Sequence, residues 1–134
     1  MEPIYQIKMK VRDYELDSQS IVNNANYQHY YEVARHEFLE MHHMSFTELQ
    51  KQGIDAVVSS ITIKYRKSLK GSDEFMCTVN LRKQGVRYIF DQKIIRIQDN
   101  ELCSEASVEV VCLVNGKLSP PTVFDEAFSQ YLTE

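Results

Sequence analysis

The spacing of apolar residues changes along the chain and separates it into strand and helix segments. Over residues 4–13 apolar and polar positions alternate loosely, which predicts a β-strand. From Tyr27 the apolar residues follow the spacing of one helical face over about four turns, at Tyr27, Tyr30, Tyr31, Ala34, Phe38 and Met41. We expect this segment to form the longest helix, with Asn23 or Asn24 as its N-terminal cap.

The second half of the chain is dominated by alternation with a period of two. Ser45-Phe-Thr-Glu48 is a capping box and Gly53 a typical helix stop, so a short helix is predicted over residues 46–52. Four strands then follow, separated by turn sequences, at 57–65, 75–81, 86–97 and 102–114. After Pro120 and Pro121 a final short helix is expected over residues 123–132.

This order of elements predicts an α+β fold. One strand, a long helix and four strands in series form a five-stranded antiparallel sheet wrapped around one long helix, because sheet twist lets the strands curl around an apolar helix. No repeat, linker or low-complexity tract divides the sequence, so we expect a single domain over residues 1–134. Because unpaired sheet edges are usually covered, we expect a dimer that joins two sheets edge to edge.

Composition narrows the range of partners. The formal net charge of −4 argues against a nucleic acid or an anionic membrane as the partner. No apolar stretch is long enough to span a bilayer, and we expect a cytoplasmic protein. The three cysteines lack the spacing of a metal or redox site, so they are expected to be free thiols in the core.

The loop before the long helix carries the most informative polar residue, Asp17. The unpaired amides and the positive dipole end of a helix stabilise a developing oxyanion, and a carboxylate beside them can act as a base or a nucleophile. A carbonyl compound bound at the helix start is therefore a candidate substrate. An acidic residue at such a position is more commonly a cap or a turn former, and the residues by themselves leave both interpretations open.

Two windows of the sequence resemble the hot-dog-fold thioesterases of the 4-hydroxybenzoyl-CoA thioesterase type. Their loop-to-helix motif, Asp-x-x-Gly-x-Val-x-x-x-x-Tyr with an Arg or His further along the helix, is similar to Asp17, Val22, Tyr27 and Arg35. The second motif, Tyr-x-x-Pro-x-x-x-Gly-Asp, is similar to residues 65–73. In element order the resemblance covers nearly the whole chain.

The chain departs from these motifs at two positions, and from the plant acyl-carrier-protein thioesterases at a third. Ser20 stands where Gly is common, and Ser68 stands where Pro is common, so the shapes of the two loops can differ. Ile21 stands where plant acyl-carrier-protein thioesterases carry a functional His, although the following Val-Asn-Asn looks similar. A mechanism that needs this histidine is therefore disfavoured, as is a hydratase or dehydratase activity, which resembles a pattern with a loop histidine.

The resemblance implies an acyl-CoA thioesterase without a cofactor. Asp17 would attack the thioester carbonyl or activate water, and the backbone N–H of Asn24 would hold the thioester oxygen. Val22 and Tyr27 would contact the substrate. In this fold a second subunit completes the pocket, and Ser59 and Ser60 are the positions expected opposite Asp17, although ordinary polar strand residues fit the same pattern.

Other functions and the acyl group stay open at this point. An acyl-acyl-carrier-protein thioesterase and a non-catalytic acyl-thioester binding module are the alternatives to the acyl-CoA thioesterase. The aromatic residues of the helix would accept an aromatic ring or an aliphatic chain. The assembly expected is a homodimer or a homotetramer.

The basic residues around Arg66 and Lys67 are the candidate site for the CoA phosphates, because they form the densest basic run in an acidic chain. A solvated strand edge protected by lysines explains the same residues equally well. Arg82, Lys83 and Arg87 are a weaker second candidate.

His29, Glu32 and His36 have helical spacings that could serve a metal ion. A solvent-facing helical stripe explains the same three residues without a fourth ligand. We therefore expect no metal site there.

Overall fold

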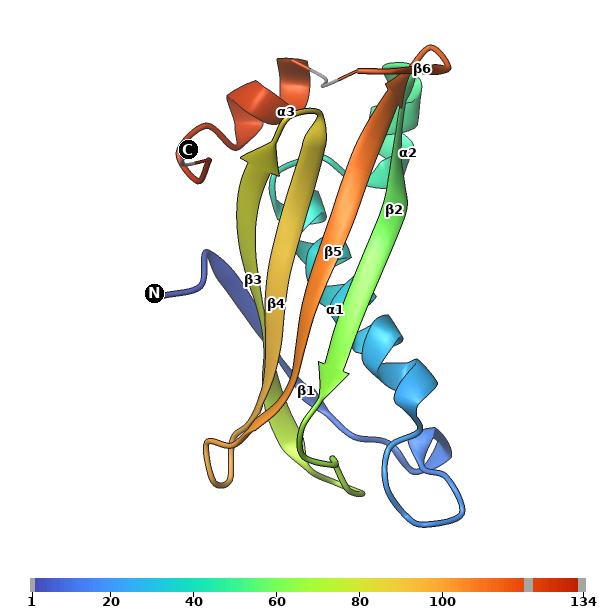
Figure 1. Ribbon diagram of the computed structural model, residues 1–134, viewed down its shortest axis with the longest axis vertical. Coiled ribbons are helices and arrows are strands. Elements are labelled where there is room, and N and C mark those ends of the chain that lie inside the picture. Colours follow the sequence, from blue (N-terminus) through green and yellow to red (C-terminus); the bar gives the residue numbers. More distant parts are fainter. Residues whose placement is uncertain (1, 120–121, 133–134) are drawn as a thin grey trace.

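One curled antiparallel sheet and the helix held in its concave face make up most of the computed structural model, which describes residues 2–119 and 122–132 (Figure 1). The strand order is β1-β3-β4-β5-β2, with the short β6 paired to β5. The strands are β1 (Tyr5–Lys10), β2 (Ile54–Tyr65), β3 (Glu74–Gln84), β4 (Arg87–Arg96), β5 (Leu102–Val114) and β6 (Lys117–Leu118). The helices are η1 (Asp13–Glu15), α1 (Asn24–Met41), α2 (Phe46–Lys51) and α3 (Thr122–Ala127).

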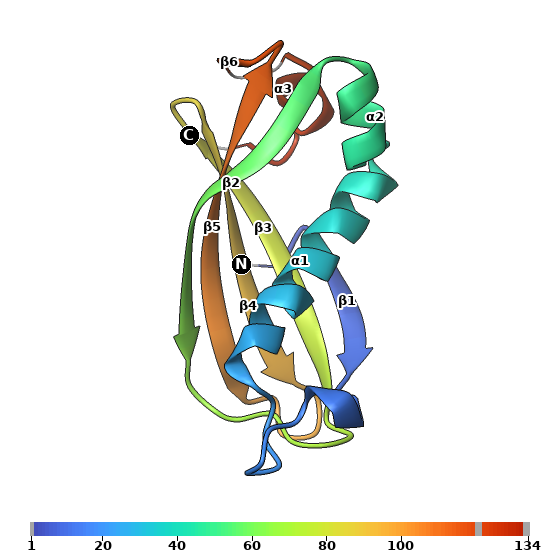
Figure 2. The same ribbon diagram turned by 90° about the vertical axis from the view of Figure 1, so that its right-hand side faces the viewer.

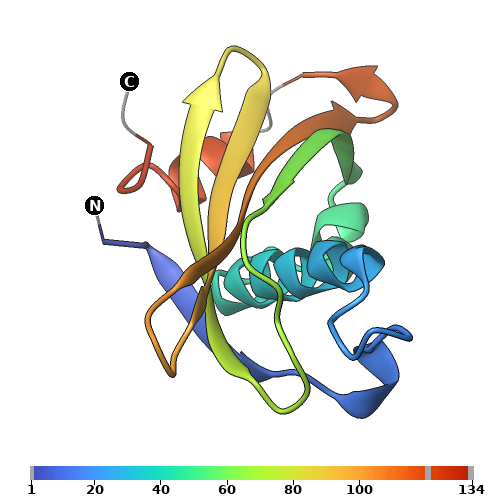
Figure 3. The same cartoon turned by 60° about the horizontal axis from the view of Figure 1, so that its bottom comes forward.

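Helix α1 crosses the concave face of the sheet, as Figures 2 and 3 show from two sides. Most of its apolar stripe is buried against the strands, with Tyr31, Ala34 and Phe38 fully buried, but the last predicted member, Met41, is 51% exposed. Asn23 is the N-cap, with its side-chain oxygen accepting a hydrogen bond of 3.0 Å from the Ala25 N–H. The predicted helix and its cap are both confirmed, because the apolar spacing and the cap chemistry agree.

The sheet leaves two outer strands, β1 and β2. Strand β2 pairs with β5 along its whole length, with a bulge between Val58 and Ser60. The other side of β2 has no strand partner among the described residues. Its Val57 and Val58 are 43% and 46% exposed, so this edge presents apolar side chains to solvent.

Both ends of α2 follow the sequence prediction closely. The Ser45 hydroxyl accepts a hydrogen bond of 3.3 Å from the Glu48 N–H, and Gly53 has φ +75°, as a helix-terminating glycine does. Strand β2 begins at Ile54, three residues before the predicted start at 57. These added residues pair with the end of β5, a long-range contact that the local pattern does not contain.

The carboxyl end needs two corrections. Helix α3 ends at Ala127 and does not reach 132, because a turn follows in which the Tyr131 N–H bonds to the Phe128 carbonyl at 2.8 Å. This turn brings the Phe128 ring within 5.3 Å of Phe38, between centroids. Strand β6 was not predicted, although Asn115-Gly116, both with positive φ, is the usual signal of a tight hairpin. The prolines expected to begin the last helix lie outside the described residues.

The three cysteines are free and buried, as predicted. Burial raises the pKa of the Cys112 thiol to about 12, so this side chain packs as a protonated apolar group. Within the described residues, no helix is both long and apolar enough to cross a membrane.

Candidate active site

Three connections meet at one end of the molecule: the segment before α1, the β2–β3 loop and the β4–β5 turn (Figure 1). The segment before α1 folds back on itself as a small hairpin. Leu16 and Val22 form an antiparallel bridge, and the Asp17 N–H donates to the Ile21 carbonyl at 2.9 Å. The hairpin therefore holds Asp17 beside the first residues of α1.

The Asp17 side chain is half-buried and takes part in the turn. Its Oδ1 accepts a hydrogen bond of 2.8 Å from the Gln19 N–H, the contact of an Asx turn. No described residue donates a hydrogen bond to its Oδ2. Asp17 can therefore form the turn through Oδ1 and still use Oδ2 in a reaction.

The start of α1 presents an amide beside this carboxylate. The Asn23 side chain accepts from the Ala25 N–H, and the Asn23 carbonyl accepts from the Asn26 N–H at 2.9 Å. Among the described residues no group accepts from the Asn24 N–H, and Asn24 is exposed. At the positive end of an 18-residue helix, this amide can stabilise an oxyanion.

The predicted substrate contacts Val22 and Tyr27 are buried and hold the β2–β3 loop. The Val22 N–H donates to the Leu69 carbonyl at 2.9 Å. The Tyr27 hydroxyl accepts from the Leu69 N–H at 3.1 Å, and burial raises the pKa of this phenol. Both residues thus fix the loop against the start of α1, and their contact with a substrate stays a prediction.

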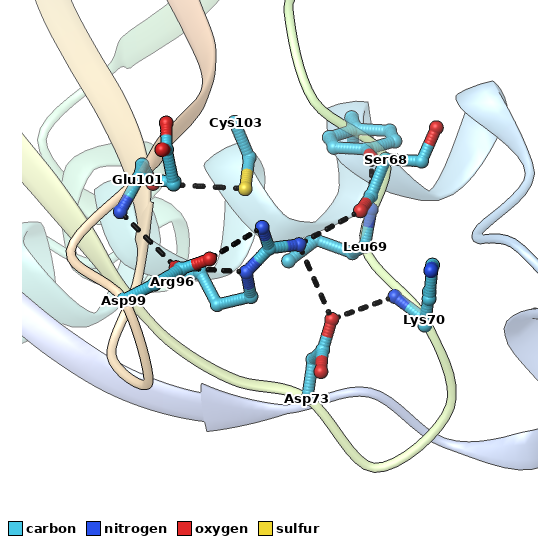
Figure 4. Close-up of polar contacts among 9 residues, drawn as sticks. Ser68, Leu69, Lys70, Asp73, Arg96, Asp99, Glu101 and Cys103 are labelled. Atoms are coloured by element: carbon cyan, nitrogen blue, oxygen red, sulfur yellow. Dashed lines mark hydrogen bonds and ion pairs between the residues drawn. The ribbon is translucent and has the colours of Figure 1, made fainter.

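Arg96, near the end of β4, fastens the same loop from the other side (Figure 4). Its Nη1 donates to the Ser68 carbonyl at 3.0 Å, and its Nε and Nη2 bond to the two oxygens of Asp99 at 2.9 and 2.8 Å. Asp73 lies 3.7 Å from Nη1 and accepts from the Lys70 N–H. One guanidinium therefore joins the β2–β3 loop to the β4–β5 turn.

Glu15 lies beside the candidate site, and no motif in the sequence points to it. Its Oε1 accepts from the Tyr30 hydroxyl at 2.6 Å and from the Arg12 N–H at 2.8 Å. Its carbonyl accepts from the Asn26 side chain at 3.0 Å, so Glu15 ties η1 to α1. Burial and the Glu15 carboxylate raise the pKa of Tyr30 far above its usual value. Asn26 and Tyr30 lie 11 and 15 positions after Glu15, too far along the chain for a local sequence pattern to reveal these hydrogen bonds.

Ser59 and Ser60 lie in the middle of β2, at the bulge, and are exposed. The Ser59 hydroxyl donates to the Glu109 carbonyl at 3.3 Å. Tyr65, whose ring lies 5.2 Å from that of Tyr27, is six residues further along β2, about 20 Å at the rise of a strand. Within one chain the two serines are therefore remote from the start of α1.

Of the basic residues proposed for CoA, Arg66 is held by an acidic partner. Its Nε bonds to Glu105 at 2.7 Å, and both side chains remain partly exposed. Lys67 is exposed, and its N–H shares the Cys103 carbonyl with the N–H of Arg66. Lys67 therefore stands next to the ion pair of Arg66 and Glu105. The negative charge of Glu105 reduces the positive potential expected from the basic residues around Arg66 and Lys67.

The three residues of α1 considered for a metal ion, His29, Glu32 and His36, lie on two different surfaces. His29 lines a groove against β1, whereas Glu32 and His36 line a pocket against β2. The His36 ring packs at 4.6 Å from Phe46, and burial lowers the pKa of this imidazole. In the part of the chain that the structure describes, no cluster of three or more His, Cys, Asp or Glu could hold a metal ion.

A sheet curled around one helix, with a carboxylate-bearing hairpin at the helix start, defines a protein of the hot-dog class. The family pattern described as the thioesterase-like superfamily matches residues 11–132, and the chain belongs to this family. The family and the fold predicted from the two motifs are thereby confirmed.

Relatives of known name agree with this assignment. The chain is 34% identical over 109 residues to the long-chain acyl-CoA thioesterase FadM of Escherichia coli, covering 81% of this chain and 82% of FadM. It is 34% identical over 116 residues to the acyl-acyl carrier protein thioesterase ATL3 of Arabidopsis thaliana, covering 86% of this chain. It spans 61% of ATL3 and 60% of the related ATL2, somewhat under two thirds of each.

A solved structure shows how closely the fold is shared. The crystal structure of YbaW from Escherichia coli, named a probable thioesterase, superposes with a TM-score of 0.80 at 29% identity. The superposition covers 96% of this chain and 98% of YbaW. The arrangement of α1 and the sheet is therefore common to both proteins.

Proposed function

We propose that the protein is an acyl-CoA thioesterase, which hydrolyses an acyl-CoA to the free acid and CoA. The observation that carries this proposal is the exposed Asn24 N–H at the start of α1, beside the hairpin that carries Asp17. Membership of the thioesterase-like superfamily and the acyl-CoA thioesterase named among the relatives support it.

The proposed chemistry uses one carboxylate and one amide. As a base, Asp17 takes a proton from water, and the resulting hydroxide attacks the thioester carbonyl carbon. The Asn24 N–H and the positive end of α1 stabilise the tetrahedral oxyanion. The C–S bond then breaks, and the departing thiolate of CoA takes the proton.

The same arrangement accommodates Asp17 as a nucleophile. Its oxygen would then bond to the carbonyl carbon and expel the CoA thiolate, leaving a mixed anhydride that water hydrolyses. Single turnover in ¹⁸O-labelled water separates the two routes. Label that enters the Asp17 carboxylate supports the nucleophile, because water has then attacked the aspartyl carbon of the anhydride. Label confined to the product acid supports the base only if borohydride also traps no anhydride at Asp17.

Replacement of Asp17 by Asn tests the proposed function itself. The Asn side-chain oxygen can still accept from the Gln19 N–H, so the hairpin should be retained while the base is lost. We expect thioester hydrolysis, measured as thiol release from a panel of acyl-CoAs, to fall by about 10²–10⁴. Ser18→Asn in the same loop is the matched control. Full activity in Asp17→Asn would exclude Asp17 from the mechanism.

The proposed assembly is a dimer through the outer edge of β2, which could close further into a tetramer. Twelve residues of strand with exposed Val57 and Val58 form an edge of the kind that proteins usually cover. A second copy would bring its Ser59 and Ser60 toward the Asp17 hairpin. Sedimentation equilibrium tests this assembly, and Val58→Lys should weaken it. A monomer in the wild type would contradict it.

The carrier group of the substrate is proposed to contact Arg66 and Lys67. Their reversal to Glu should raise KM for an acyl-CoA more than for the same acyl group on N-acetylcysteamine, which lacks the nucleotide. An equal rise for both would exclude this site. An acyl carrier protein remains the alternative, because its acidic surface suits the same residues. Parallel assays of acyl-CoA and acyl-acyl carrier protein decide between the carriers.

A further inference from the structure

A pocket of about 440 Å³ lies between α1, the strands β2, β4 and β5, and the short helices α2 and α3. This volume is within the range of small-molecule sites, roughly 300–1,000 Å³. Most of the walls are apolar, formed by Leu39, Phe46, Ala56, Phe90, Val110 and Phe124. Val57 and Val58, from the β2 edge proposed for the dimer contact, also line the pocket. The polar residues that line the pocket are Glu32, Arg35 and His36.

Arg35 is unusual because it is a buried cation without an acidic partner. The residue is 5% exposed, and no Asp or Glu of the described chain lies within ion-pair distance of it. Its Nη1 donates to the Gln92 Oε1 at 3.2 Å, and Gln92 in turn donates to the Tyr31 carbonyl at 3.1 Å. A neutral amide therefore orients the guanidinium without neutralising its charge.

The remaining donors of Arg35 are not completely enclosed. Within the described residues, every fully buried side-chain nitrogen or oxygen has a hydrogen-bond partner. Among the residues that the structure describes, the Nε and Nη2 of Arg35 have no such partner, so these two atoms are not fully enclosed by the described residues. The pocket that Arg35 lines is the space available to them. A planar guanidinium with parallel N–H groups is the natural partner of a carboxylate.

We propose that this pocket binds a carboxylate carried on an apolar body, with the carboxylate on Arg35 and the body along the apolar walls. Pairing would offset the cost of a buried, unpaired charge. Glu32 is exposed, so water and salt screen its repulsion of the ligand. The site lies apart from the Asp17 hairpin, which does not line the pocket.

Two sources could supply this carboxylate. One is a free acid, the product of the proposed thioester hydrolysis. Naming the product as the ligand rests on the proposed function, whereas the binding of a carboxylate in this pocket does not. The other is a carboxylate at the far end of the acyl group. Gln92, which accepts from the guanidinium, also donates to the carbonyl of Tyr31, and Tyr31 follows Asn24 by seven residues, or about 10 Å of helix. An extended chain of eight or nine bonds spans about that distance.

Calorimetric titration of the assembled protein with decanoate tests the site. We expect decanoate to bind the wild type at least tenfold more tightly than Arg35→Met, whereas 1-decanol should bind both alike. Lys117→Met removes an exposed positive charge elsewhere and should bind decanoate like the wild type. Equal affinity of the wild type and Arg35→Met for decanoate, or no binding to the wild type, would overturn the proposal.

A measurement on the wild type guards against a variant that fails to fold. In methyl NMR spectra, decanoate should shift the signals of Val57 and Val110 in the pocket more than those of Ile7 and Val33, which line the groove at β1. Larger shifts at Ile7 and Val33 would place the ligand elsewhere and contradict the proposal.

Turnover then distinguishes the two sources. Hydrolysis of ω-carboxynonanoyl-CoA at a kcat/KM at least tenfold above that of decanoyl-CoA, with the preference lost in Arg35→Met, assigns the site to the acyl end. Arg35-dependent inhibition by decanoate without that preference assigns it to the free acid. If neither thioester is hydrolysed, the proposed function fails, while the binding measurements still decide the pocket.

Discussion

The Nη1 of Arg96 and the carbonyl oxygen of Ser68 are joined by a 3.0 Å hydrogen bond that connects two loops distant in sequence (Figure 4). The next residue holds the hairpin and the start of α1: the Leu69 carbonyl accepts from the Val22 N–H, and the Leu69 N–H donates to the Tyr27 hydroxyl. The position of Asp17, the proposed catalytic residue, thus depends on the guanidinium of Arg96 at the end of β4.

Arg96→Lys should loosen this connection. A lysine keeps the charge but cannot bond both oxygens of Asp99 and the Ser68 carbonyl together. We expect a lower melting temperature and about a tenfold loss of kcat/KM in thioester hydrolysis, because the hairpin that carries Asp17 is displaced. Arg82→Lys, which alters an exposed ion pair with Asp91, is the control. Similar kcat/KM for both variants would show that Arg96 acts on stability alone.

The acid titration of Asp99 reports on the same contact. The hydrogen bonds from Arg96 lower the pKa of the Asp99 carboxyl. A carboxyl with a lowered folded-state pKa adds stability above its unfolded value of about 3.9, and this stability is lost as the pH falls through the folded pKa. In Arg96→Lys we expect the pKa of Asp99 to rise toward about 3.9, as followed by carbon-13 NMR.

Asp125 provides the reference in that titration, because its carboxylate bonds to Lys83 and Tyr88, far from the substitution. Its titration should be the same in the wild type and in Arg96→Lys. A variant that shifts both carboxyls equally would point to a general change of the fold.

The main helices and strands of this fold can be predicted from the sequence, whereas the long-range hydrogen bonds that position its candidate site cannot. The apolar stripe of α1 and the Asn23 cap are local, and both are predicted correctly. The bond from Tyr27 to Leu69 spans 42 positions, and the bond from Arg96 to Ser68 spans 28. No periodicity encodes such pairs, because they depend on how the sheet curls.

The candidate site residues divide in the same way, into those that a local motif suggests and features that depend on the folded structure. The resemblance of the loop-to-helix motif suggests Asp17 and the amide of Asn24, and their roles stay a prediction. It does not show that Tyr27 is buried beneath a loop or that Arg66 pairs with Glu105. The burial of Arg35 is likewise hidden, because a helical wheel does not reveal which charged residue faces a cavity.

Tyr27→Phe should cost stability even though the ring is kept. The buried Leu69 N–H would lose the phenol oxygen that accepts its hydrogen bond. Leaving a buried donor unpaired costs about 1–3 kcal/mol, which urea denaturation can measure. Tyr14→Phe is the matched control, since Tyr14 is 76% exposed. Faster hydrogen exchange at Leu69 should accompany the loss, and unchanged exchange there would contradict this account.

Ser20→Gly should stabilise the hairpin that holds Asp17. Ser20 has φ +63°, a left-handed conformation that costs a non-glycine residue about 1–2 kcal/mol. Glycine relieves this strain and adds about 0.5–1 kcal/mol of entropy cost, so we expect a net gain of roughly 0.5–1 kcal/mol. Thermal unfolding measures it as a higher melting temperature. Ser18→Gly, at a neighbouring position without positive φ, should lower the melting temperature. If both variants lower it, then the serine at 20 is not strained, and the motif glycine that it replaces serves another purpose.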